Sequence, residues 1–462
     1  MRIVDLVSMG KEYLVLGVFA ISVIMVITFI VYKCLLKGKK KINPIRILGW
    51  LFLGSYIVII LGATLFGRAE LWEKENILPL FYSYRDAWVN FSVTAWRNLI
   101  LNVCMFVPLG VLLPLMIKFF RSFWKTYLAG FFFTLCIEGI QLFGKRGIFE
   151  LDDILHNTVG MMIGYGIYAI GTAILKKYKS ENISWKKTLS LQFPLVICVI
   201  WFSAIFISYN SKELGNVSGQ YIVTYDKDKL EVKSECKYSK EAKKVPVYQF
   251  KIWSREDTTD FAEKLLQKLG TKLDTERNDF YEDTAVFYGE DQKNLWIDYA
   301  GGTYDLNEPF SEEKKVKTDI SEKEVRKVLE TYDIVIPKKA VFSKKEGRYT
   351  FTVEQQVEKD GMLDGTISGE LSEEEKILEL NYGLKKCKPY KSFVGISEQE
   401  AFEQICSGKF WYPYGREDNL FILVKECKIG YETDSKGYYQ PVYLFDCEIN
   451  GEKNEIKIPI LQ

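Results

Sequence analysis

Histidine is almost absent from this chain, because His156 is the only one in 462 residues. The long segment that follows it therefore cannot carry a Ser–His or Cys–His catalytic pair. The chain also lacks a glycine-rich phosphate loop and the His/Cys spacing of zinc sites. We expect no cofactor and no metal, and the sequence favours a non-enzymatic protein while leaving catalysis open.

Cysteine and basic charge are both limited in the second part of the chain. Five cysteines follow residue 209, and an odd number in an oxidising compartment argues against a full disulfide framework. Residues 1–209 contain 22 Lys/Arg and 11 Asp/Glu, whereas residues 210–462 contain 39 and 49. Phosphate binding needs a basic face, so this acidic part argues against a nucleic-acid partner.

Long apolar runs are abundant before residue 210. Six of them have the length of about 20 residues that a bilayer-spanning helix needs. They cover residues 13–32, 47–66, 98–117, 124–143, 152–175 and 189–209. The sequence therefore predicts a polytopic α-helical membrane bundle of about six helices at 1–209, followed by a soluble α+β domain at 210–462.

The loops between these stretches differ in charge. Those after the first, third and fifth stretches together hold fourteen Lys or Arg and one acid, Glu181. Cytoplasmic loops are enriched in Lys and Arg, so we expect these three loops to be cytoplasmic. The prediction is a multi-pass plasma-membrane protein of a Gram-positive-type bacterium, with its C-terminal domain extracytoplasmic.

A group of polar residues lies in or beside the third to fifth stretches, where polar side chains are costly and usually face a bundle interior or a cavity. At about 1.5 Å rise per residue, several of them fall about 6 to 7.5 Å below the outer ends of their helices. Together with the loop cation they predict an outward-facing ligand pocket. The candidate ligand-binding residues are Asn102, Glu138, Gln141, Arg146, Asp152, Asp153 and Asn157.

Small residues and prolines in the same stretches predict helix packing. Gly160 and Gly164 form a small-xxx-small pattern that allows close approach of another helix, and Gly110 belongs to the same packing set. Pro108 and Pro114 predict a bent or broken helix at 98–117.

Two other interpretations of the polar group remain open. Buried amides and acids often hold helices together, and Asp152 with Asp153 would favourably face the positive N-terminal end of the fifth helix. His156 lies three residues from Asp153, which allows a proton or metal role, but one histidine beside two acids is a weak metal pattern.

The order and spacing of these residues resemble the VanZ-like membrane family over about residues 50–175. The matching blocks are Asn102-Val-Cys-Met-Phe106-Val-Pro108-Leu-Gly110, Glu138-x-x-Gln141, Arg146, and Asp152-Asp153-x-x-x-Asn157-x-x-Gly160-x-x-x-Gly164. Upstream, Asn76-Ile-Leu-Pro79-Leu80 is similar to the family's Asn-Leu-Ile-Pro-Phe segment. One departure is Glu150-Leu-Asp152-Asp153, where the family often has Asp-x-Asp-Asp.

The resemblance implies a cell-envelope protein, since the family takes its name from a protein tied to teicoplanin resistance in Gram-positive bacteria. The leading hypothesis is binding of a lipid-linked or glycopeptide-type ligand near the outer leaflet, with an effect on drug susceptibility. The implied partner is a membrane lipid or cell-wall precursor. A first alternative is an enzyme acting on a lipid phosphate through Glu138, Asp152 and Asp153. A second is a sensor or scaffold that works with a membrane protein partner through the C-terminal domain.

The C-terminal domain combines alternating runs typical of strands with three predicted helices, near 258–269, 321–332 and 397–407. The last two begin with the Ser-x-x-Glu capping box, at Ser321 and Ser397. This repeat predicts two related subdomains, about 210–318 and 319–462. Residues 430–445 resemble the tail of extracytoplasmic regulatory domains of the YycI type.

Overall fold

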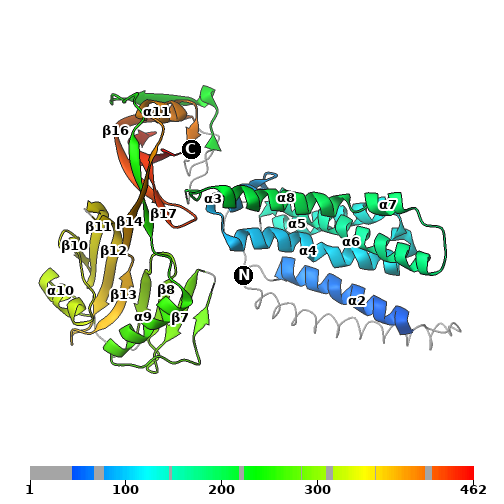
Figure 1. Cartoon of the computed structure of the whole chain (residues 1–462), viewed down its shortest axis with the longest axis horizontal. Helices are drawn as coiled ribbons and strands as arrows, with labels where there is room; N and C mark the ends of the chain where they lie inside the picture. Colours follow the sequence, from blue (N-terminus) through cyan, green and yellow to red (C-terminus); the bar gives the residue numbers. More distant parts are fainter. Residues whose placement is uncertain are drawn as a thin grey trace. The chain divides into compact units, whose positions relative to one another are not determined.

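The computed structural model describes residues 44–66, 77–144, 148–217, 223–281, 283–308, 316–358, 360–410 and 419–461 (Figure 1). The chain divides into two compact units, Met1–Glu213 and Leu214–Gln462. We call them the helical unit and the sheet unit. The predicted stretch at 13–32 lies outside the described residues.

Within the described residues, the helical unit contains five helices that are long and apolar enough to cross a membrane. These candidate spans are Arg46–Leu65, Val93–Met116, Phe123–Phe143, Leu151–Tyr178 and Trp185–Ser211. The helices are α2 (Pro44–Leu61), which continues as the π-helical turn η2 (Gly62–Phe66), α3 (Tyr82–Asn90), α4 (Val93–Met116), α5 (Phe123–Phe143), α6 (Leu151–Tyr178), α7 (Trp185–Ser190) and α8 (Phe193–Ser211). Five predicted spanning stretches are thus confirmed as long apolar helices.

Helix α4 is continuous through both of its prolines. Pro108 and Pro114 lie inside the single α-helix Val93–Met116, so the break that these residues predict does not occur. Packed neighbours can supply hydrogen bonds to backbone groups near a proline, which makes proline tolerable in membrane helices. Tyr56 of α2 donates its hydroxyl to the Met105 carbonyl at 2.7 Å, which is a packing contact beside the carbonyl of Cys104 that Pro108 leaves without its helical N–H partner.

Helices α4 and α6 approach each other at glycines. A Cβ atom on Gly160 would lie 2.1 Å from the Val103 carbonyl oxygen, and one on Gly164 would lie 2.1 Å from that of Val107. The approach is mutual, because a Cβ on Gly110 would lie 3.0 Å from the Gly164 Cα. Any larger side chain at these positions would push the two backbones apart.

The sheet unit is built on one large sheet of fourteen strands, in which all pairings are antiparallel except that of β4 with β16. Hydrogen-bonded neighbours follow the order β4-β16-β17-β5-β14-β12-β13-β9-β8-β7-β6. In addition, β11 pairs with β12 and β10, and β18 pairs with β17. The strands of this unit are β3 (Val223–Thr224), β4 (Leu230–Ser234), β5 (Lys244–Phe250), β6 (Asp279–Phe280), β7 (Thr284–Tyr288), β8 (Asn294–Asp298), β9 (Tyr304–Asn307), β10 (Val341–Lys345), β11 (Arg348–Glu358), β12 (Gly361–Leu371), β13 (Ile377–Tyr382), β14 (Lys385–Val394), β15 (Lys409–Phe410), β16 (Leu420–Thr433), β17 (Tyr438–Ile449) and β18 (Glu452–Pro459).

Three helices accompany this sheet, near the three predicted positions. They are α9 (Arg255–Lys268), α10 (Glu322–Thr331) and α11 (Glu398–Cys406). The capping boxes predicted at Ser321 and Ser397 are both formed, with Glu324 and Glu400 as the reciprocal partners. Helix α9 has a third box, between Ser254 and Asp257, which the Ser-x-x-Glu pattern did not detect because the acid is aspartate.

Among the described residues, the sheet unit has two large apolar cores and a smaller one around Tyr248, Met362 and Tyr439. The first joins α9 and α10 to strands between β7 and β13, with residues such as Leu265, Leu329 and Leu380. The second packs α11 against β16, β17 and β18, through residues such as Ile405 and Phe445. The first core draws on both sides of residue 318, so the cores do not follow the subdomain boundary expected there.

Two substitutions on α6 test the close contact between α4 and α6, one at a contact glycine and one at a glycine in open space. We expect Gly164→Ala to lower stability by about 1–3 kcal/mol, because the new methyl group would meet the α4 backbone. Gly171→Ala places its methyl in open space and should leave stability unchanged or raise it by up to about 1 kcal/mol. Thermal unfolding of both variants in detergent measures the difference. Equal melting temperatures would contradict the close α4–α6 contact.

Candidate functional site

The predicted polar residues gather around the start of α6, where a short parallel ladder brings two distant segments together. Strand β1 (Ile77–Leu78) pairs with β2 (Phe149–Glu150), with Leu78 opposite Glu150. The β1 pairing thus places the chain entering α3 beside the first turn of α6, which carries Asp152 and Asp153.

Asp152 holds the start of α3. Its two carboxylate oxygens accept hydrogen bonds from the backbone N–H groups of Phe81, at 2.5 Å, and Ser83, at 2.8 Å. Phe81 precedes α3 in a left-handed conformation, with φ of 67°. Free N–H groups and the helix dipole make a helix N-terminus favourable for a carboxylate. Since Asp152 is only 1% exposed, this is a structural anchor.

Asn102 and Asp153 connect α4 to α6. The Asn102 side-chain amide donates to the Asp153 carboxylate, with 2.7 Å between Nδ2 and Oδ1. Asp153 is 9% exposed, and Asn102 is half-buried. This bond brings into direct contact two predicted site residues that are 51 positions apart in the chain.

Glu138 of α5 faces the entry to α6. Its Oε2 atom accepts a hydrogen bond from the Glu150 backbone N–H at 3.1 Å. The Glu150 side chain in turn accepts from the Ser83 hydroxyl at 3.1 Å. Two carboxylates therefore tie α5, β2 and α3 together.

In each of the two buried amide side chains, Gln141 and Asn157, the nitrogen has a hydrogen-bond partner and the oxygen has none among the described residues. Gln141 donates through Nε2 to the Thr64 carbonyl at 2.9 Å, and Asn157 donates through Nδ2 to the Thr134 hydroxyl at 2.8 Å. Both amides are at least 97% buried. Gln141 Oε1 and Asn157 Oδ1 have no hydrogen-bond partner in the part of the chain that the structure describes.

His156 belongs to an aromatic contact. Its Nε2 atom lies 2.9 Å from the Tyr84 hydroxyl, and the two ring centroids are 5.2 Å apart. The other ring nitrogen, Nδ1, is buried without a hydrogen-bond partner among the described residues. Within those residues, no three His, Cys, Asp or Glu side chains gather closely enough to hold a metal ion.

The predicted residues thus surround one end of α6 but contact different partners. Asn102 and Asp153 meet, Glu138 and Asp152 bind backbone groups, and Arg146 lies outside the described residues. The predicted cation over the carboxylates therefore remains a prediction.

Several hydrogen-bond partners of these residues are not among the predicted site residues, namely Thr64, Ser83, Tyr84 and Thr134. Thr134 is seven residues from Gln141, a spacing that places both on one face of α5 and was available as a signal. The β1–β2 pairing that presents Ser83 and Tyr84 left no comparable pattern, because each strand has only two residues.

Chemically, this arrangement suits binding and positioning more than proton transfer. Both oxygens of Asp152 are occupied by backbone donors, as is one oxygen of Glu138. These hydrogen bonds occupy oxygens that a general base or a metal ligand would need. The spare amide oxygens and the spare histidine nitrogen can serve a polar group or water.

Two solved structures resemble parts of the chain at low similarity. An uncharacterized protein from Eubacterium rectale ATCC 33656 has a TM-score of 0.25 and 11% identity, covering 52% of this chain and 89% of that one. The C-terminal domain of YpeB from Bacillus megaterium has a TM-score of 0.21 and 12% identity, covering 46% and 95%. Scores this low establish no shared fold, and the YycI-type resemblance stays a prediction.

The helical unit gives a clearer result. Residues 50–174 match the family model of VanZ/LLP1. Protein VanZ of Enterococcus faecium is 28% identical over 142 residues, which is 30% of this chain and 84% of that protein. The predicted resemblance is confirmed over α4, α5 and α6, the helices that carry the polar residues. Over residues 50–174, this chain is similar to the VanZ/LLP1 family.

Proposed function

We propose that the protein is a cell-envelope membrane protein whose polar residues around the start of α6 bind the polar part of a lipid-linked or glycopeptide-type ligand. Binding there would alter the susceptibility of the cell to a glycopeptide such as teicoplanin. The observation that carries this proposal is the set of spare buried polar atoms: Gln141 Oε1, Asn157 Oδ1 and His156 Nδ1.

A buried polar atom without a partner costs about 1–3 kcal/mol. Such a cost is expected where a ligand or water completes the hydrogen bonds, and buried polar side chains in membrane helices are functional-site candidates for the same reason. Gln141 and Asn157 each use the donor side of the amide on a protein partner, and their acceptor oxygens have no partner among the residues that the structure describes. The site therefore favours a ligand that donates hydrogen bonds, such as one rich in hydroxyl or amide groups.

The side of the membrane follows from the charge of the loops. Lysines are concentrated at the end of α6 and just beyond it, which favours a cytoplasmic location for this end: Lys176 and Lys177 lie in the last turn of α6, Lys179 follows it, and Lys186 and Lys187 lie in α7. The start of α6, at the other end of this 28-residue helix, would then lie near the outer leaflet. The sheet unit, which follows α8, would be extracytoplasmic.

The alternative of catalysis on a lipid phosphate has less support. It assigns acid, base or metal-binding roles to Glu138, Asp152 and Asp153, but two of these three carboxylates stabilise backbone N–H groups. A sensor or scaffold role through the sheet unit agrees with the two-unit organisation and is compatible with ligand binding in the helical unit.

Charge-neutral variants test the polar site. Glu138→Gln and Asp153→Asn each keep an oxygen that can accept the observed hydrogen bond, from the Glu150 N–H or from Asn102. We expect both proteins to fold with near-normal melting temperatures in detergent. If charge serves ligand binding, both should lose the glycopeptide-susceptibility phenotype, measured as the minimal inhibitory concentration in cells that express each variant at equal level.

Asp152→Asn is the matched contrast. An asparagine has one acceptor oxygen, whereas Asp152 satisfies two backbone donors, so this variant should lose about 1–3 kcal/mol of stability. A sharp fall in folded yield for Glu138→Gln and Asp153→Asn as well would show that all three are structural, and the proposed site would be abandoned.

The orientation has a separate test. Cysteines introduced at Glu373, in the turn after β12, and at Lys177, near the end of α6, are both at exposed positions. We expect a membrane-impermeant thiol reagent to label Glu373→Cys on intact cells and Lys177→Cys only after lysis. The native cysteines are common to both proteins and provide the background. The reverse labelling pattern would overturn the extracytoplasmic placement.

A further inference from the structure

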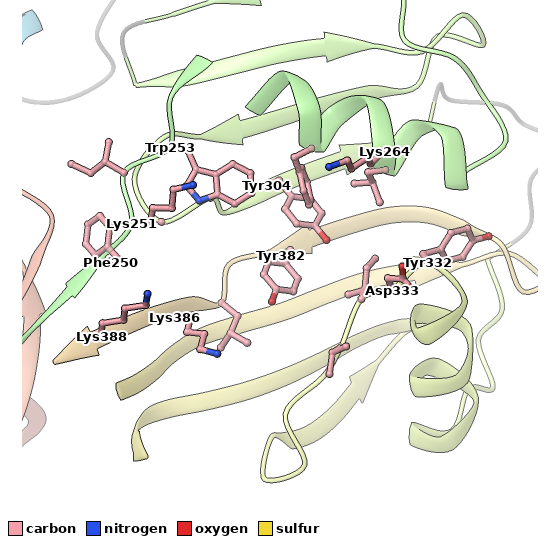
Figure 2. A pocket seen from close by; sticks show the side chains of 18 of the residues that line it. Phe250, Lys251, Trp253, Lys264, Tyr304, Tyr332, Asp333, Tyr382, Lys386 and Lys388 are labelled. Atoms are coloured by element: carbon pink, nitrogen blue, oxygen red, sulfur yellow. The ribbon is translucent and has the colours of Figure 1, made fainter. Parts of the chain in front are cut away.

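The sheet unit contains a pocket of about 830 Å³ that no part of the proposed function uses (Figure 2). It is bordered by α9, by the segments that follow β5 and α10, by the Gly301–Gly302 turn and by residues of β13 and β14. Its volume falls within the roughly 300–1,000 Å³ typical of small-ligand sites.

One wall of the pocket is a continuous series of aromatic rings. Ring centroids are 5.2 Å apart between Trp253 and Phe261, 5.0 Å between Phe261 and Tyr304, and 4.9 Å between Tyr304 and Tyr382, which are stacked at 7°. Burial raises the pKa of both tyrosines, so they stay neutral and add no negative charge to the wall. Figure 2 shows Trp253, Tyr304 and Tyr382 on successive elements of the same wall.

A glycine turn fixes the position of the indole. Gly302 has φ of +68°, and a Cβ atom there would lie 2.2 Å from Cε2 of Trp253. A side chain at this position would displace the ring, so the close contact depends on glycine. Trp253 is also held by its backbone, whose N–H donates to the Tyr299 carbonyl at 2.8 Å.

The other lining residues bring positive charge into an acidic unit. Among the lining residues that the structure describes there are five lysines and one carboxylate. Lys268 pairs with that carboxylate, Asp333, and Lys251 pairs with Asp257. The remaining three are Lys264, Lys386 and Lys388.

These three lysines are exposed, and no carboxylate of the described residues lies within ion-pair distance of them. Lys386 and Lys388 stand two positions apart on β14, on the face opposite the fully buried Cys387. Their charge is therefore directed to the same side of the strand.

We propose that this pocket binds an anionic carbohydrate, with a sugar ring against Trp253 and Tyr382 and a phosphate or carboxylate group near Lys386 and Lys388. Aromatic faces provide apolar area to the C–H face of a sugar, and lysine ammonium groups attract its anionic substituent. Ile252 and Val335, which are 59% and 74% exposed and line the same pocket, add apolar contact area.

The strand pairing argues against an acidic peptide as the occupant. An extended peptide commonly binds by adding a strand to an unpaired sheet edge. The strands at this pocket have paired neighbours on both sides along part of their length, which leaves only short free edges: β5 pairs with β14 and β17, β14 with β5 and β12, and β13 with β12 and β9. Recognition must therefore come from side chains, as it does in carbohydrate sites. The inference is independent of the site in the helical unit and of the membrane orientation.

Isothermal titration calorimetry on the full chain in detergent, at low salt, provides the test. The probes are N-acetylglucosamine 1-phosphate, N-acetylmuramic acid, neutral N-acetylglucosamine, inorganic phosphate and hexaglutamate. We expect at least one of the two anionic sugars to bind more tightly than the neutral sugar and more tightly than phosphate alone. The tighter of the two identifies the preferred anionic group.

Three variants locate the binding. Lys386→Ala with Lys388→Ala should weaken binding of the anionic sugar about tenfold, while Lys323→Ala with Lys327→Ala, at exposed positions of α10, removes the same charge and should have no effect. Trp253→Ala should weaken sugar binding as well, with melting temperature as its folding control. Equal affinity for neutral and anionic sugars, equal loss in both lysine pairs, or tightest binding of hexaglutamate would each overturn the proposal.

Discussion

The helical unit depends on one constraint, the need of polar groups among apolar helices to find hydrogen-bond partners. Asp152 illustrates its consequence. Because its carboxylate accepts from Phe81 and Ser83, one residue of α6 fixes a segment about 70 positions earlier in the chain. The same requirement places Glu138 against the Glu150 N–H, so the start of α6 is held from two directions. The polar residues therefore have a structural role even where they also form a candidate site.

Helix packing and site geometry share one face of α6. Gly160 and Gly164 bring the α4 backbone close, and one and two turns before Gly160, Asn157 and Asp153 face α5 and α4. The absence of side chains at the glycines sets the α4–α6 separation, and that separation puts Asn102 within 2.7 Å of Asp153. A larger side chain at either glycine would therefore also change the distance between the polar residues of α4 and α6.

The sequence predicted what depends on local pattern and composition. Apolar length located five helices that are long and apolar enough to cross a membrane, and Ser-x-x-Glu located the starts of α10 and α11. Of the bend or break that the sequence predicted at Pro108 and Pro114, the break does not occur, because packed neighbours make proline tolerable inside a membrane helix. It also could not foresee that Asp152 would stabilise α3, since that contact depends on a two-residue pairing between distant segments.

The pocket in the sheet unit could not be predicted from net charge, because net charge is an average over the whole unit. Residues 210–462 have ten more acids than bases, yet three lysines from α9 and β14 that have no ion-pair partner among the described residues line one pocket. Charges in salt solution act over a screening length of about 8–10 Å, so an approaching anion responds to the nearest groups and not to the sum. The aromatic wall strengthens this local effect, since its low polarity reduces screening on one side of the lysines. An acidic unit can therefore present a site suited to an anion.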